Sequence, residues 1–309
     1  MHRFAHIATF TLLLTAGLAL GLAGLTLSGC GAATTTEQED TGGYSAPAIR
    51  EITFNEDNAE CAHDCAIDTT NANAGYITAS ATSSGTLKFQ VLCGDGSYNY
   101  DMPNDGQVSA FPMNMGDGTY TLRVMQNVEG NNYIQLFSTT VDVTLDSEFE
   151  PFLSPSIYCD FDKDSACVQE AQTLIEGANS QAAAAEAIYN WVVENIDYDT
   201  DKAKQVQNVT GYIPDPDETY TDKSGICFDF AALYAAMMRS VGIPTKIVTG
   251  YVAEGSIYHA WNMVYLEGTW VNVSFTVPAN EWSRIDTAFA SAGPQILGGK
   301  DDYVDRFVY

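Results

Sequence analysis

Basic residues are scarce in this chain. Only 13 Lys and Arg stand against 40 Asp and Glu among 309 residues, so the formal net charge is −27. A protein this acidic repels the phosphates of nucleic acids and anionic lipid headgroups. We therefore expect no nucleic-acid partner. We interpret the acidity as a source of solubility, with attraction of cationic groups such as amines as the alternative.

The chain is 46% hydrophobic and 17% charged, which excludes a collagen, a coiled coil and a multispan membrane protein. One apolar run, residues 10–27, follows Arg3 and ends in Leu-Ser-Gly-Cys at Cys30. This ending resembles the lipobox of bacterial lipoproteins. The resemblance implies a signal peptide over 1–29 and a lipid anchor on Cys30 that holds the protein on the cell membrane, outside the cytoplasm. An uncleaved transmembrane helix is the alternative, and it leaves the rest of the chain outside too.

Residues 30–50 are small and polar and predict a flexible tether. Residues 51–155 show short alternating runs separated by Gly-Asp-Gly, Asn-Asp-Gly and Gly-Asn-Asn turns. This spacing predicts an antiparallel, β-sandwich-like domain. The expected strands are 75–82, 86–93, 107–112, 119–125 and 133–145.

Residues 156–309 change to helical periodicity and predict an α+β domain. Apolar positions at helical spacing predict helices over 166–177 and 180–196. Residues 197–224 have no clear period and predict a long loop, a kind of segment that is often functional. The Asp160-x-Asp162-x-Asp164 run is not an EF-hand, because Ser165 and Ala171 replace the glycine and the glutamate of that loop.

A candidate nucleophile follows the long loop. Cys227 comes two residues after Gly225 and is expected in the first turn of an amphipathic helix, where unpaired N–H groups favour a thiolate. Strands are expected over 245–252 and 257–266. Of the four histidines, two precede Cys30, so the base must be His259, in the second of these strands, or His63.

These stretches resemble the transglutaminase-like superfamily, a papain-related group of cysteine enzymes. The motifs are G-x-C-x-D-x-A-x-L at 225–233, R-x-x-G-I-P at 239–244, G-Y-V at 250–252 and Y-H-A-W-N at 258–262. The resemblance covers roughly residues 166–309. It implies a papain-like α+β fold, with Cys227 as the nucleophile and His259 as the base.

In this superfamily an aspartate orients the histidine, and it commonly lies four residues after a tryptophan. Trp270 plus four is Ser274, whereas Trp282 plus four is Asp286. Asp286 is the assigned third catalytic residue, since only a carboxylate can offset the imidazolium charge. An extra strand is then required between His259 and Asp286.

The oxyanion formed in the reaction needs hydrogen-bond donors. The expected donors are the N–H of Cys227 and one upstream group, for which Tyr212 and Gln207 are the candidates. Asp229 is interpreted as a structural residue that satisfies backbone donors at the helix start.

With Cys30 and Cys227 assigned, five cysteines remain, and five cannot all pair within one chain. A disulfide between Cys159 and Cys167 is expected, because oxidation is favoured outside the cytoplasm. A zinc site built from Cys61, His63, Cys65 and Cys93 ranks lower, since the spacing is irregular. The chain is expected to need no metal and no other cofactor.

The leading hypothesis is a surface-anchored cysteine enzyme that acts on amide bonds through a thioester. Hydrolysis of a peptide or protein substrate, cell-wall fragments included, is preferred to transglutamination. The alternative is a catalytically silent binding protein that keeps only the fold.

Overall fold

The computed structural model describes residues 43–206, 209, 211–252, 257–266, 268–273 and 303–309. All of them belong to one unit, Thr41–Tyr309. The predicted signal segment, Cys30, Gln207, Ser274 and Asp286 lie outside the described residues. Within the described part of the chain, no helix combines the length and the apolar character needed to cross a membrane.

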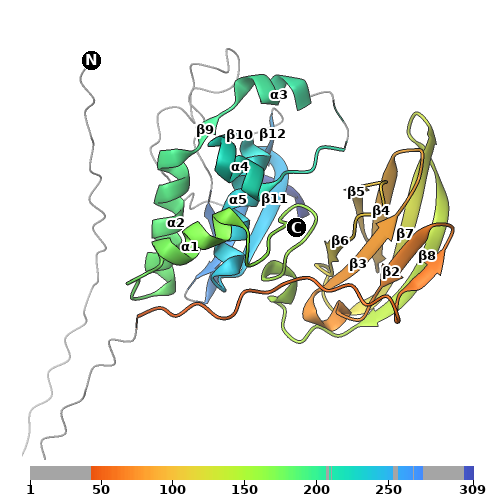
Figure 1. Ribbon diagram of the computed structural model, residues 1–309, viewed down its shortest axis with the longest axis horizontal. Coiled ribbons are helices and arrows are strands. Elements are labelled where there is room, and N and C mark those ends of the chain that lie inside the picture. Colours follow the sequence, from red (N-terminus) through yellow and green to blue (C-terminus); the bar gives the residue numbers. More distant parts are fainter. Residues whose placement is uncertain (1–42, 207–208, 210, 253–256, 267, 274–302) are drawn as a thin grey trace, which may run out of the picture. The chain divides into compact units, whose positions relative to one another are not determined.

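The N-terminal half contains two four-stranded antiparallel sheets (Figure 1). One has the order β1-β2-β3-β6 and the other the order β5-β4-β7-β8. Phe89 of β4 stacks on Phe111 of β6 with their ring centroids 4.1 Å apart, so the apolar faces of the two sheets meet in one core. The predicted antiparallel, sandwich-like arrangement is confirmed. The strands are β1 (Glu60–Ala62), β2 (Cys65–Asp68), β3 (Tyr76–Ala81), β4 (Leu87–Cys93), β5 (Gly96–Met102), β6 (Ser109–Pro112), β7 (Gly118–Glu129) and β8 (Asn132–Val143), with short 3₁₀ turns η1 (Ala72–Ala74) and η2 (Glu150–Phe152).

Three of these strands, β1, β2 and β5, were not predicted. The β1–β2 hairpin closes through His63 and Asp64, whose φ angles are 53° and 57°. Two successive positive φ angles define the type I′ turn of tight hairpins, but neither residue is the glycine that normally signals it. Without that signal, the two short strands on either side, of three and four residues, had no recognisable boundary.

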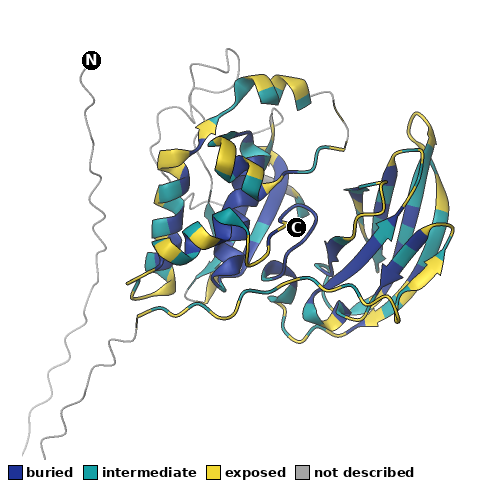
Figure 2. Cartoon of the chain, in the orientation of Figure 1, coloured by how far each residue is buried: buried dark blue, intermediate teal, exposed yellow. Residues whose placement is uncertain are grey.

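The second half is built around one buried helix and one antiparallel sheet. Helix α5 (Cys227–Ser240) is buried from its third residue to its end (Figure 2). It lies beside the sheet β13-β12-β11-β14, and the Asn262 side chain of β12 donates to the Ala231 carbonyl of α5 at 2.9 Å. The predicted α+β class is confirmed. The remaining elements are α1 (Ala166–Leu174), α2 (Gln181–Asn195), β11 (Thr245–Val252), β12 (Ile257–Leu266), β13 (Thr269–Val273) and β14 (Tyr303–Val308).

The segment predicted as a long loop, 197–224, contains regular structure instead. It includes β9 (Asp197–Tyr198), α3 (Thr200–Val206), α4 (Pro216–Asp222) and the first residue of β10 (Ser224–Gly225). Its aspartates cap the helices: Asp199 accepts from the Lys202 N–H at 2.8 Å and Asp215 from the Glu218 N–H at 3.0 Å. The composition that indicated a loop thus marks helix starts.

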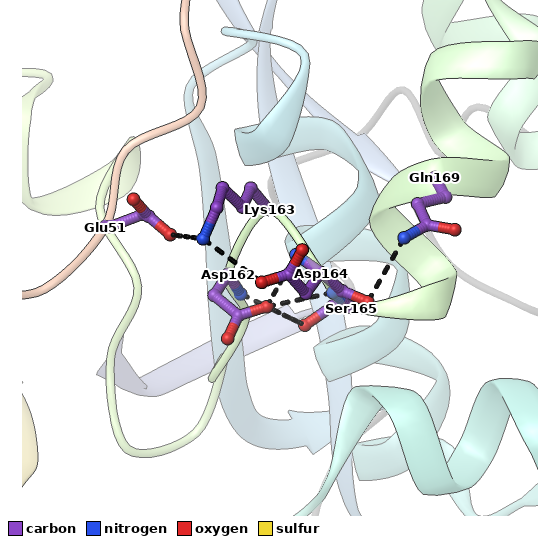
Figure 3. A network of polar contacts seen from close by, with 6 residues as sticks. All are labelled: Glu51, Asp162, Lys163, Asp164, Ser165 and Gln169. Carbon is purple, nitrogen blue, oxygen red and sulfur yellow. Dashed lines mark hydrogen bonds and ion pairs between the residues drawn. The ribbon is translucent and has the colours of Figure 1, made fainter.

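The Asp160–Asp164 stretch lies immediately before helix α1, and Figure 3 shows the contacts of its last three residues. Asp162 accepts from the N–H groups of Asp164 at 2.8 Å and Ser165 at 2.9 Å, which forms a turn before the helix. Lys163 bridges Asp164 and Glu51, both at 3.1 Å. The Asp162 carboxylate therefore organises the turn that leads into α1, whereas the first N–H groups of the helix donate to Asp217.

The expected disulfide between Cys159 and Cys167 is not formed. Both side chains are buried free thiols, and Cys159 is among the groups that raise the pKa of Cys167. Cys61, Cys65 and Cys93 are free as well. Across the residues that the structure describes, no three His, Cys, Asp or Glu side chains come together as metal ligands.

Candidate active site

The start of α5 is organised by Asp229. Its carboxylate accepts from the Ile226 N–H at 2.9 Å, the one of the two capping-box bonds that the third helical residue supplies. A Cβ atom on Gly225 would lie 2.6 Å from the Asp229 Cβ, so only glycine fits at this position. Cys227 is the first residue of the helix, as predicted, and the structural role expected for Asp229 is confirmed.

The Cys227 sulfur lies among backbone N–H groups. It interacts with the N–H groups of Cys227 itself, of Phe228 and of Ala260, and each of these favours the thiolate. Ala260 belongs to β12 and directly follows His259, which pairs across the sheet with Gly250 of β11. The structure therefore brings Cys227 to the strand position that carries His259.

The other candidate base is in a different part of the fold. His63 occupies the exposed turn between β1 and β2, in the N-terminal sheets. His259 is partly buried, one residue from the backbone group that contacts the Cys227 sulfur. Position therefore favours His259 over His63 as the partner of Cys227.

Burial outweighs the backbone donors in setting the protonation states. It raises the pKa of Cys227 to about 11, against the N–H groups that lower it, and the nearby Asp229 carboxylate raises it further. Burial also lowers the pKa of His259 to about 4. The resting pair is therefore a neutral thiol and a neutral imidazole, in contrast to the thiolate predicted from the sequence.

Two side chains from the preceding segment reach the Asp229 carboxylate. The Lys202 ammonium lies 2.9 Å from one oxygen, and the Tyr212 hydroxyl donates to the other. Since the single hydroxyl proton of Tyr212 points at Asp229, this side chain could serve an oxyanion only after that bond breaks. Sequence reasoning missed Lys202, because no local pattern links it to a carboxylate on another helix.

The domain that carries these residues matches a known family. Residues 169–275 match the transglutaminase-like superfamily, a span that runs from α1 past β13 and includes both Cys227 and His259. This part of the chain is a transglutaminase-like domain. The superfamily includes cysteine proteases and acyltransferases.

Curated relatives share part of the transglutaminase-like domain. The chain is 32% identical over 113 residues to kyphoscoliosis peptidase of Mus musculus, a match that covers 33% of this chain and 17% of the relative. It is 28% identical over 167 residues to a UPF0252 protein of Methanocaldococcus jannaschii, covering 50% of this chain and 46% of that protein. The chain thus spans less than half the length of either relative.

Among solved structures, a proposed cysteine protease of Cytophaga hutchinsonii aligns with 67% of this chain and 77% of its own. The sequence identity is 18% and the TM-score is 0.36.

Proposed function

We propose that the protein is a cysteine enzyme that cleaves amide bonds through a thioester on Cys227, with peptides or proteins as substrates. The observation that carries the proposal is the position of the Cys227 sulfur, at the first turn of α5 and against the Ala260 N–H that follows His259. A thiol at a helix start and an imidazole that can take its proton form the minimal set for acyl transfer by a cysteine.

The reaction begins with a proton transfer. Because thiol and imidazole are both neutral at rest, the His259 ring takes the proton of Cys227 as the sulfur attacks the substrate carbonyl carbon. The C–N bond then breaks, and the imidazolium returns the proton to the leaving amine. Water attacks the resulting thioester, with His259 again as the base, and releases a carboxylic acid and the thiol. An amine in place of water would give transamidation.

The tetrahedral oxyanion needs donors that are already in place. The N–H of Cys227 is at the first position of α5 and has no carbonyl partner within the helix, so it is available for this purpose. It also lies at the positive end of the helix dipole. We propose this group as one oxyanion donor, with one upstream group, Tyr212 or Gln207, as the second.

A carboxylate that accepts from the imidazole would stabilise the imidazolium. Asp286 is our candidate, and Ser274 is the alternative. Asp286→Asn should lower turnover strongly with the fold intact, whereas Ser274→Ala should have a small effect. A strong loss of turnover in purified Ser274→Ala, with nearly normal turnover in purified Asp286→Asn, would assign the orienting of the imidazole to the segment that follows Trp270.

The enzyme is proposed to act outside the cytoplasm, anchored by lipid on Cys30. The support is the Leu-Ser-Gly-Cys ending of the apolar run. Cys30→Ser should leave the precursor unprocessed and unlipidated in membrane fractions. A normally processed lipoprotein from this variant would reject the anchor.

The activity itself is tested by screening. Peptide and wall-fragment mixtures are incubated with the wild-type protein, Cys227→Ala and Cys61→Ser, and new amines are measured. Cys61 is the matched control because its thiol is exposed and belongs to the N-terminal sheets. Release that disappears only in Cys227→Ala supports the proposal. Release that survives in Cys227→Ala contradicts it, and no release from any substrate would favour a silent binding protein.

A further inference from the structure

Among the ion pairs given for the described part of the chain, the one between Lys202 and Asp229 has the most deeply buried carboxylate. The Asp229 side chain is 0% exposed and the Lys202 side chain 24%, with nitrogen and oxygen 2.9 Å apart. The Lys202 ammonium also lies 5.3 Å from the centre of the Tyr212 ring. By contrast, Lys204 on the same helix pairs with Asp201 where both side chains are more than 70% exposed.

A buried carboxylate two residues from a nucleophilic thiol is unfavourable for the chemistry. Its negative charge opposes formation of a second negative charge on the sulfur, and burial weakens the screening by water. The capping bond to Ile226 nevertheless requires an acceptor at this position. Asp229 is therefore useful as a hydrogen-bond acceptor, but its negative charge has to be compensated if Cys227 is to form a thiolate.

Lys202 supplies that compensation from outside the helix. Asp199 caps α3 by accepting from the N–H of Lys202 at 2.8 Å, and the Asp199 N–H donates to the Gly225 carbonyl at 2.9 Å. These bonds fix the start of α3 against the residues just before Cys227. The Lys202 ammonium is therefore carried by a backbone segment that these hydrogen bonds hold in place.

We propose that Lys202 is a positioning residue for the thiol chemistry: its ammonium neutralises the buried Asp229 carboxylate and so allows Cys227 to lose its proton. The inference rests on the proposed function only in taking Cys227 as the reactive group. Two titratable groups interact with the thiol itself, Asp229 of α5 and Tyr198 of β9. Lys202 and Tyr212 contact Asp229, Asp199 acts on Tyr198, and His259 of β12 precedes the residue whose N–H reaches the sulfur.

The test measures iodoacetamide alkylation of Cys227 against pH, read by mass spectrometry on the peptide that contains this residue. Lys202→Met should move the midpoint up by about one pH unit, because the carboxylate is left uncompensated. Asp229→Asn should move it down, since asparagine keeps an acceptor for Ile226 without the charge. Lys202→Arg should restore the wild-type midpoint, and Lys204→Met should not change it.

Opposite shifts in Lys202→Met and Asp229→Asn are the decisive result, because a loss of packing would move both in the same direction. Equal midpoints for Lys202→Met and Lys204→Met, or shifts of the same sign, would overturn the proposal. If Lys202→Met fails to fold, the double variant with Asp229→Asn replaces it. Its midpoint should equal that of Asp229→Asn alone and lie below wild type, because Lys202 acts through a carboxylate that this variant lacks. A midpoint clearly above that of Asp229→Asn alone would show that the ammonium acts on the thiol directly and would overturn the proposal.

Alkylation needs no substrate, so this test is separate from the proposed function. Amide cleavage that survives in Cys227→Ala would reject the function and leave the alkylation shifts interpretable. Conversely, alkylation midpoints that are the same in Lys202→Met and wild type, together with loss of amide cleavage in Cys227→Ala, would reject only the role of Lys202 and leave the proposed function in place.

Discussion

The two ends of helix α5 hold opposite buried charges. Asp229 lies in the first turn with 0% exposure, and Arg239 lies in the last turn with 2%. Both signs match the helix dipole, which is positive at the N-terminus and negative at the C-terminus. The two ends therefore follow the same electrostatic rule.

They differ in what satisfies the charge. Arg239 donates to three main-chain carbonyls, those of Thr245 at 2.9 Å, Ser154 at 2.9 Å and Tyr309 at 3.1 Å. Asp229 is held chiefly by side chains, those of Lys202 and Tyr212, which come from the segment before the nucleophile. At the C-terminal end of α5, the buried charge connects distant main-chain segments. At the N-terminal end, the partners of the buried charge lie next to the residue proposed to react.

The largest effect should follow from breaking the C-terminal end. Arg239→Met removes a donor from three carbonyls; that of Tyr309 still accepts from the Ile247 N–H, whereas those of Thr245 and Ser154 lose a buried hydrogen bond. Each buried group left unsatisfied costs about 1–3 kcal/mol, and the loss of the large buried side chain adds to this. The free energy of unfolding should fall by at least about 3 kcal/mol in urea denaturation. Arg306→Met, at an exposed position of β14, should stay within about 0.5 kcal/mol of wild type. A loss of less than about 1 kcal/mol in the free energy of unfolding of Arg239→Met would show that this charge does not stabilise the fold.

The next effect depends on pH and involves His259. Its pKa is about 4 in the folded protein and near 6.5 when unfolded, so between these values the unfolded state binds more protons. Stability therefore falls as pH drops from about 6.5 to 4, by up to about 3 kcal/mol from this residue. His259→Gln should remove that part of the pH dependence. The exposed His63→Gln should keep it, and thermal unfolding between pH 4 and 7 checks both variants. Parallel curves for wild type and His259→Gln would refute the burial argument.

The sequence predicted the helix that starts at Cys227 and the two strands after it with accurate boundaries. Those elements have strong apolar patterns. It also singled out Arg239 and Gly242 within one motif, and the structure supplies the reasons. Arg239 binds three carbonyls, and Gly242 has a φ of 82° with Pro47 so close that a Cβ atom would lie 2.4 Å from it.

The errors have a common physical origin. Residues 197–224 were predicted to be a loop because they are rich in aspartate, which is common in loops and equally common at the starts of short helices. The thiolate was expected from the N–H groups and dipole of the helix start together with the His259 imidazolium, and the sequence contains no measure of how deeply Cys227 is buried. The Lys202–Asp229 pair joins two helices that no periodicity connects.

The start of helix α2, which carries no reactive group, is a control for the start of α5, and we expect a smaller effect there. Ser180 caps α2 by accepting from the Ala183 N–H at 3.1 Å. Ser180→Ala should lower the free energy of unfolding by about 1 kcal/mol, with no change in Cys227 alkylation. Asn179→Ala, at the exposed neighbouring position, should do neither. Altered alkylation in Ser180→Ala would mean that any weakened helix start disturbs the thiol, so that the N-terminal end of α5 would not be special.

The most direct test of the central claim follows an acyl group onto the protein. Wild type, His259→Ala and His63→Ala are mixed with p-nitrophenyl acetate, quenched in acid at successive times, and the acetylated cysteine is located by mass spectrometry. The account predicts an acetyl thioester on Cys227 that forms and decays much more slowly in His259→Ala and at the wild-type rate in His63→Ala. Acetylation at another cysteine, or formation and decay on Cys227 that do not depend on His259, would contradict it.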